Sequence, residues 1–210
     1  MTRYETWESA LAECPLVAIL RGVQPGEVAE IGLALVEAGF KLIEVPLNSP
    51  EPFESIARLT SCLRGRAMVG AGTVLASDQV DQVAAAGGTM IISPNADPNV
   101  IERTRELGMV SIPGVFTPGE AFAALAAGAN ALKIFPAELA SPSSLRALRA
   151  VLSPPTKILV VGGIGPETMP EWLKAGANGF GVGSALYKPG RDCVDVASRA
   201  GVLVAASKVE

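Results

Sequence analysis

The stretch AALAAGANALKIFP, residues 123–136, contains the unit from which the fold can be predicted. It starts with residues typical of a helix, reaches Gly128 where a left-handed helix end belongs, and continues as the apolar run 131–135. A helix that leads through a glycine into a short apolar strand is typical of parallel α/β proteins. The same transition recurs along the chain at Gly39, Gly87, Gly108 and Gly176.

Eight short apolar runs predict eight strands. They cover residues 16–22, 42–47, 68–74, 90–95, 110–115, 131–135, 157–161 and 179–183. Segments of helical period follow them, for example 27–38, 78–86, 118–127 and 167–175. Capping residues or prolines predict helix starts at Ser49-Pro50, Ser77-Asp78, Thr117-Pro118, Ser141-Pro142 and Gly165-Pro166.

Eight strand–helix units can close a parallel sheet and remove both of its edges. We therefore predict an α/β fold, a single-domain (β/α)8 TIM barrel over residues 1–210. The alternative is an open Rossmann-type sheet, but no GxGxxG motif opens the first helix.

Composition excludes several classes of function. The net charge is −4, no run of Lys or Arg is present, and aromatic residues make up 5%, so we expect no nucleic-acid partner. The apolar run 16–20 is too short to span a membrane, and we expect neither a membrane partner nor a secretory signal. Cys14, Cys62 and Cys193 form no CxxC motif, which favours a reducing, cytoplasmic location. The mean hydropathy of +0.37 suggests an apolar interface in a homo-oligomer.

The sequence contains no histidine, which excludes Ser/His and Cys/His nucleophiles and imidazole metal ligands. Two ionisable residues instead lie inside predicted strands: Lys133 in 131–135 and Glu44 in 42–47. Burial lowers the pKa of a lysine and raises that of a glutamate, which makes the amine a nucleophile and the carboxyl group an acid/base catalyst near neutral pH. The alternatives are a structural ion pair between them, or a lysine that reaches the barrel rim.

Other polar residues follow the ends of predicted strands, where barrel active sites lie. Arg21 ends the first strand and suits a carboxylate or phosphate, or it pairs with Glu44; Thr73 lies in the predicted strand 68–74, beside glycines that let a ligand approach the backbone closely. The last two strands end in Gly162-Gly163 and Gly183-Ser184, a pair of loops suited to binding phosphate through backbone N–H groups. The substrate is then expected to be a phosphate ester.

These residues stand in motifs that resemble one family, the class I pyruvate aldolases acting on 2-keto-3-deoxy-6-phosphogluconate (KDPG) or 2-keto-3-deoxy-6-phosphogalactonate (KDPGal). The motifs are ILRG (19–22), IEVPLNSP (43–50), GAGTV (70–74), SPN (93–95), LKIFP (132–136), VGG (161–163) and GS (183–184). The resemblance spans nearly the whole chain.

The resemblance implies a Schiff base on Lys133, proton transfer by Glu44, and substrate binding by Arg21, Thr73, Gly162, Gly163, Gly183 and Ser184. It further implies a phosphorylated 2-keto-3-deoxy sugar acid as substrate, no metal or other cofactor, and a homotrimer. Asn48 stands where gluconate-type members usually carry arginine, so the sequence looks like the galactonate branch. The gluconate epimer remains the alternative substrate.

Two other functions are compatible with such a barrel. One is a sugar-phosphate isomerase or epimerase that uses Lys133 and Glu44 as an acid/base pair without an imine. The other is a phosphosugar sensor or assembly subunit without turnover. Fold alone does not choose among these functions.

Overall fold

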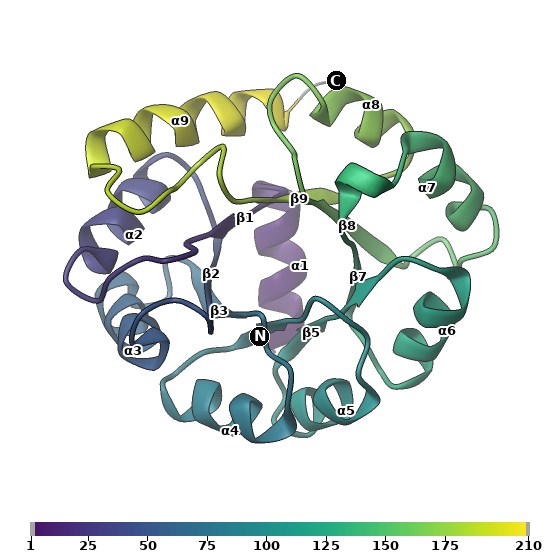
Figure 1. Ribbon diagram of the computed structural model, residues 1–210, viewed down its shortest axis with the longest axis horizontal. Coiled ribbons are helices and arrows are strands. Elements are labelled where there is room, and N and C mark those ends of the chain that lie inside the picture. Colours follow the sequence, from purple (N-terminus) through teal and green to yellow (C-terminus); the bar gives the residue numbers. More distant parts are fainter. Residues whose placement is uncertain (1–2, 209–210) are drawn as a thin grey trace.

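Parallel strands close into a barrel surrounded by helices, as the computed structural model shows for residues 3–208 (Figure 1). The strands in that range are β1 (Leu16–Ile19), β2 (Leu42–Pro46), β3 (Met68–Gly72), β4 (Met90–Ile92), β5 (Val110–Ile112), β6 (Gly114–Val115), β7 (Ala131–Ile134), β8 (Lys157–Val161) and β9 (Gly179–Val182). Their order in the sheet is β5-β4-β3-β2-β1-β9-β8-β7-β6. The predicted TIM barrel is confirmed.

The predicted strand 110–115 is divided into β5 and β6 at Pro113, and the prediction of one continuous strand there was wrong. Proline has no N–H group to donate to a sheet. Its carbonyl oxygen still accepts a hydrogen bond from the Lys133 N–H group at 2.9 Å, and the Asn130 N–H group donates to the Ser111 carbonyl at 2.9 Å. The Asn130 bond joins β5 to the residue before β7, and β6 pairs with β7 itself, so β5 and β6 fill one position of the barrel.

Helices surround the strands on the outside (Figure 1). In the described part of the chain they are α1 (Arg3–Glu13), α2 (Val28–Glu37), α3 (Pro52–Leu63), α4 (Ser77–Ala85), α5 (Pro98–Glu106), α6 (Pro118–Ala126), the 3-10 helix η1 (Ala137–Leu139), α7 (Pro142–Arg149), α8 (Met169–Lys174) and α9 (Cys193–Ala206). None of the helices between residues 3 and 208 is both long and apolar enough to cross a membrane.

Helix ends agree better with the prediction than helix starts. All five predicted glycines have positive φ, from 64° at Gly108 to 108° at Gly39, which is unfavourable for residues with a Cβ atom. Thr117 and Ser141 form capping boxes at α6 and α7. The starts predicted at Ser49 and Gly165 were wrong, because the N-cap residues of α3 and α8 are Glu51 and Thr168. The start predicted at Ser77-Asp78 is confirmed, since α4 begins at Ser77.

One end of the barrel is closed by α1, which lies across the centre of the ring in Figure 1. The Trp7 side chain is fully buried and belongs to the same apolar cluster as Leu42, Met68 and Met90, the first residues of β2, β3 and β4. Full burial of such side chains stabilises the fold by about 1.5–3 kcal/mol each. The amino-terminal end of the strands is therefore filled, and a site must lie toward their carboxyl ends.

Candidate active site

Lys133 and Glu44 point into the barrel from β7 and β2, two strands that are not neighbours in the sheet. Lys133 lies two residues after Ala131 in β7, and Glu44 lies two residues after Leu42 in β2; both Ala131 and Leu42 belong to the interior cluster. Side chains two apart on a strand share a face. Lys133 is 7% exposed and Glu44 is 3% exposed. They line one small space together with Val17, Ile19, Ile92, Ile112, Leu159, Val161 and Gly181.

The Lys133 amine is desolvated but has no carboxylate partner. Burial lowers the pKa of Lys133 to about 8; Glu44 opposes this effect, and Arg21 adds to it. Among the side chains that the structure describes, no salt bridge involves Lys133. Its Nζ lies 4.6 Å from the centroid of the Phe135 ring. A neutral fraction of roughly a tenth is thus available at pH 7, far more than for an exposed lysine.

The pKa of Glu44 is shifted in the opposite direction to that of Lys133. Burial raises the pKa of its carboxyl group to about 7, against the opposing charges of Lys133 and Arg21. Its Oε2 atom is buried and has no hydrogen-bond partner among the described residues. A carboxyl group that is partly protonated at neutral pH can both donate and accept a proton.

A cavity of about 400 Å³ lies at the carboxyl ends of β1, β8 and β9. It is lined by five of the residues predicted to bind substrate: Arg21, Gly162, Gly163, Gly183 and Ser184. Ile19, Val161 and Gly181 line both this cavity and the space around Lys133 and Glu44. The space around Lys133 and Glu44 therefore adjoins the predicted phosphate loops.

Arg21 does not form the predicted alternative ion pair with Glu44. Its side chain is exposed, and Nη1 donates a hydrogen bond to Asn48 Oδ1 at 2.9 Å. The Gly22 N–H group donates to Ser49 Oγ at 2.9 Å, so two bonds attach the end of β1 to the loop after β2. Neither bond involves a carboxylate, so the Arg21 guanidinium has no negatively charged partner.

Thr73 lies directly after β3 with φ at 57°, an unusual conformation for a β-branched residue. It lines neither the space around Lys133 nor the 400 Å³ cavity. The structure thus brings seven of the eight predicted site residues into these two spaces and leaves Thr73 beside them.

Sequence reasoning missed four residues at this site. Phe135 stacks near Lys133, while Glu138, Tyr187 and Lys188 line the 400 Å³ cavity. Tyr187 is buried, and its hydroxyl group donates to Glu27 Oε1 at 2.7 Å. The sequence signals were their positions, a few residues after Lys133 and after Gly183-Ser184.

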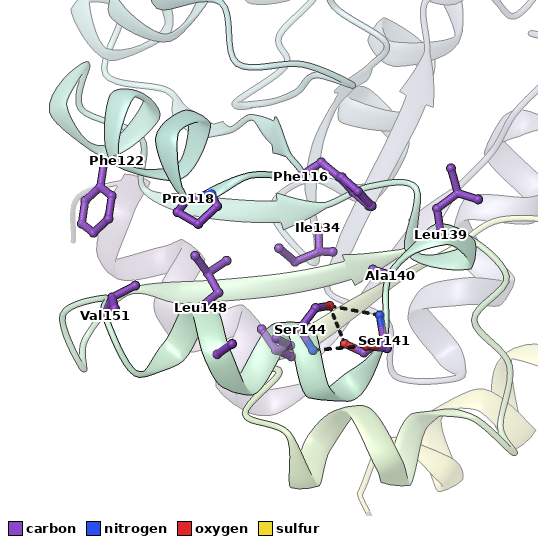
Figure 2. A pocket seen from close by; sticks show the side chains of 12 residues that line it. Phe116, Pro118, Phe122, Ile134, Leu139, Ala140, Ser141, Ser144, Leu148 and Val151 are labelled. Carbon is purple, nitrogen blue, oxygen red and sulfur yellow. Dashed lines mark hydrogen bonds between the residues drawn. The ribbon is translucent and has the colours of Figure 1, made fainter.

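A larger cavity, of about 640 Å³, lies outside the barrel between α6 and α7. Figure 2 shows its apolar lining, with Phe116 and Phe122 on one side and Leu148 and Val151 on the other. Its lining has no charged side chain, and its two serines, Ser141 and Ser144, form the capping box of α7. Within residues 3–208, no cluster of three or more Cys, Asp or Glu side chains is placed to hold a metal ion.

The fold and the site define a class of protein: a closed parallel barrel with a buried amine and a buried carboxyl group at its open end. Comparison with known proteins gives the family. Residues 7–197 match the model of the KDPG and KHG aldolase family. The chain belongs to this family.

Several members are similar over most of their length. A probable 2-dehydro-3-deoxy-6-phosphogalactonate aldolase of Rhizobium meliloti is 47% identical, covering 92% of each chain. The 2-dehydro-3-deoxy-6-phosphogalactonate aldolase of Escherichia coli is 43% identical over 95% of this chain and 96% of its own.

Two solved structures have the same fold. A native KDPGal structure has a TM-score of 0.90 at 43% identity, covering 91% of this chain and 93% of its own. A KDPG aldolase of Legionella pneumophila, with pyruvate captured as a covalent carbinolamine, has a TM-score of 0.84 at 25% identity and covers 93% and 97%.

Proposed function

We propose that this chain, acting as one domain over residues 1–210, is a Schiff-base aldolase that cleaves 2-dehydro-3-deoxy-6-phosphogalactonate to pyruvate and glyceraldehyde 3-phosphate. The observation that carries the proposal is the burial of Lys133 and Glu44 in one apolar space without a salt bridge. A structural ion pair would bring the two charges into contact. The relatives that are 47% and 43% identical bear the name of this activity.

The first half of the reaction uses the amine as nucleophile. Neutral Lys133 attacks the C2 ketone and forms a carbinolamine, as the Legionella pneumophila enzyme does with pyruvate. Protonated Glu44 gives its proton to the carbinolamine hydroxyl, which leaves as water and yields a protonated imine. The raised pKa of Glu44 supplies this proton near neutral pH.

The second half breaks the carbon–carbon bond. Ionised Glu44 takes the proton of the C4 hydroxyl group, the C3–C4 bond breaks, and its electrons move into the imine to give an enamine. Glyceraldehyde 3-phosphate leaves. The enamine is then protonated at C3, and water hydrolyses the imine to release pyruvate and regenerate the amine. Glu44 returns to its starting state because it donates and accepts in turn.

Charge and loop geometry support a proposed placement for the two ends of the substrate. Arg21 is proposed to bind the carboxylate end together with Thr73, since the Arg21 guanidinium has no carboxylate partner. Gly162, Gly163, Gly183 and Ser184, which line the 400 Å³ cavity, are proposed to bind the phosphate. The neutral Asn48 beside Arg21 favours the galactonate epimer over the gluconate epimer, and kcat/KM for the two sugar acids tests that preference.

Mass spectrometry after treatment with pyruvate and sodium borohydride tests the proposal. We expect a reduced pyruvyl adduct on the peptide that contains Lys133. Lys133→Met, which keeps the apolar stem, should lose the adduct and reduce turnover by roughly 10³-fold or more. Lys174→Ala in α8, an exposed lysine away from the mouth, should keep both. An active wild-type protein without an adduct would favour isomerase or epimerase chemistry instead.

We also propose a homo-oligomer in the cytoplasm, a trimer by family resemblance. The surface around the 640 Å³ cavity supports an apolar interface: Phe116 is 48% exposed, Phe122 49%, Val151 57% and Leu139 76% (Figure 2). Monomers rarely expose adjoining apolar side chains of this size. The free thiols of Cys14, Cys62 and Cys193 agree with a reducing location.

Light scattering at micromolar concentration tests this interface. Wild type should elute as an oligomer, and Phe122→Asp should shift it toward monomer. Val194→Asp, at another exposed apolar position, should leave the mass unchanged. A monomeric wild type would contradict the proposal.

A further inference from the structure

The carboxylate of Glu138 lies against the loop that is proposed to bind phosphate. A Cβ atom built on Gly162 would be 2.1 Å from Glu138 Oε2 and 2.9 Å from the Ala137 backbone nitrogen. At Gly163 the same construction would approach Glu138 Cγ at 3.0 Å. Gly162 and Gly163 have φ values of 117° and 62°. The two glycines therefore permit both the turn and the close approach of this side chain.

Nothing in the described part of the chain neutralises this carboxylate. No hydrogen bond or salt bridge to Glu138 is found there, although η1 holds its backbone at the rim of the 400 Å³ cavity. The cationic residues lining the cavity are Arg21 and Lys188. An anion bound at the Gly162-Gly163 backbone would therefore lie close to this negative charge.

We propose that Glu138 is a specificity-determining gate: its carboxylate covers the phosphate loop in the free enzyme and must be displaced by the substrate phosphate. The inference rests on the proposed function, which assigns this loop to the phosphate. The Glu138 carboxylate and the substrate phosphate are both negative and repel each other at this loop, so the carboxylate must move away before the phosphate binds. A substrate compensates for this cost through its carboxylate end at Arg21 and its bond to Lys133, whereas inorganic phosphate has neither contact.

The gate thus discriminates against free phosphate. Inorganic phosphate can bind only to the loop, and the Glu138 carboxylate excludes it. A sugar acid phosphate makes further contacts and can displace the carboxylate. The same carboxylate returns to the loop when glyceraldehyde 3-phosphate leaves, which favours product release. Glu138 acts on binding and does not take part in proton transfer at C2, C3 or C4.

The test compares Glu138→Gln with Glu167→Gln. Each substitution removes one negative charge, but Glu167 lies nearest to Gly165, whereas Glu138 lies nearest to Gly162 and Gly163. We expect Glu138→Gln to lower the inhibition constant of inorganic phosphate about fivefold, the effect of removing one partly solvated like charge. The KM for the sugar acid phosphate should fall as well. Glu167→Gln should match wild type in both constants.

Each other result overturns the gate. If Glu138→Gln raises KM, the carboxylate binds a substrate hydroxyl group. If both variants change phosphate inhibition equally, the effect is one of general charge, and if neither changes it, Glu138 does not oppose the anion. Borohydride trapping of pyruvate, which has no phosphate, should be unchanged in Glu138→Gln. Loss of trapping in wild type would refute the aldolase mechanism, whereas phosphate inhibition tests the gate by itself.

Discussion

Glu44 and Gly72 fit together across neighbouring strands, because a Cβ atom built on Gly72 would lie 1.5 Å from Glu44 Oε2. Glu44 is on β2 and Gly72 is the last residue of β3, paired in register with Pro46. Because Gly72 has no side chain, the buried Glu44 carboxyl group fits beside it. The Oε2 atom of Glu44 has no hydrogen-bond partner among the described residues. Gly72 therefore determines where the proposed proton carrier sits.

Gly72→Ala should displace the Glu44 carboxyl group and impair catalysis more than folding. We expect kcat to fall by about 10²-fold or more, since proton transfer depends on placement. Overpacking should cost about 1–3 kcal/mol of unfolding free energy. Steady-state kinetics and urea unfolding measure the two effects. Gly201→Ala in α9, where an added Cβ meets nothing within 4 Å, is the control and should leave kcat unchanged.

A second prediction concerns stability and pH. Burial raises the pKa of Glu44 from 4.5 to about 7, so between these pH values the folded chain holds a proton that the unfolded chain has released. The stabilising contribution of the protonated group is complete below pH 4.5 and is lost as the pH rises through about 7. Glu44→Gln cannot ionise and should not show this loss.

Urea unfolding at pH 5 and pH 8 should therefore separate the two proteins. The free energy of unfolding of Glu44→Gln should exceed that of wild type by a margin that grows by ~2–3 kcal/mol over this range. The Lys133 ammonium group lowers the pKa of Glu44 and so reduces this margin. Lys133→Met should therefore lose more unfolding free energy than wild type over the same pH range. Equal pH dependence in wild type and Glu44→Gln would mean that Glu44 ionises in the fold as readily as in water.

The barrel could be predicted from sequence because each of its repeating units is local. A helix end at Gly128 and the apolar run after it lie within a few residues of each other, and both signals recur. The helix α1 could not be predicted in this way. It is not part of a strand–helix unit, and Trp7 is buried only because the closed barrel places the starts of β2, β3 and β4 against it.

The burial of Lys133 and Glu44 in one space could also be predicted, because a lysine and a glutamate inside apolar strands are uncommon enough to indicate a candidate site. The contacts of the loops could not. Arg21 with Asn48 is a pair 27 residues apart, and Glu138 meets Gly162 through a 3-10 helix that no periodic pattern indicates. Such contacts depend on loop geometry, which the barrel determines only after it has closed.

Thr73 offers a third prediction, in which stability and binding respond differently. Its φ of 57° strains a β-branched residue by about 1–3 kcal/mol. Thr73→Gly relieves this strain but adds backbone entropy to the unfolded chain, so the melting temperature should stay level or rise. Thr73→Ala keeps most of the strain and should not gain stability. Both variants lose the hydroxyl group and should raise KM for the sugar acid to the same extent. A normal KM in both would exclude Thr73 from substrate binding.

The final prediction concerns Asn48, whose Oδ1 accepts a hydrogen bond from Arg21 Nη1 at 2.9 Å. A neutral acceptor orients the guanidinium without cancelling its charge, so the substrate carboxylate still meets a free cation. Asn48→Asp puts a carboxylate in this place and should compete with the substrate, raising KM about tenfold with little change in kcat. Asn48→Ala only frees the guanidinium and should raise KM less. If the variants compete for Arg21, KM for the sugar acid should be highest in Asn48→Asp, lower in Asn48→Ala and lowest in wild type. The pyruvate concentration needed for half-maximal borohydride trapping should follow the same order. An equal rise of KM in both variants would instead indicate that Asn48 itself contacts the substrate.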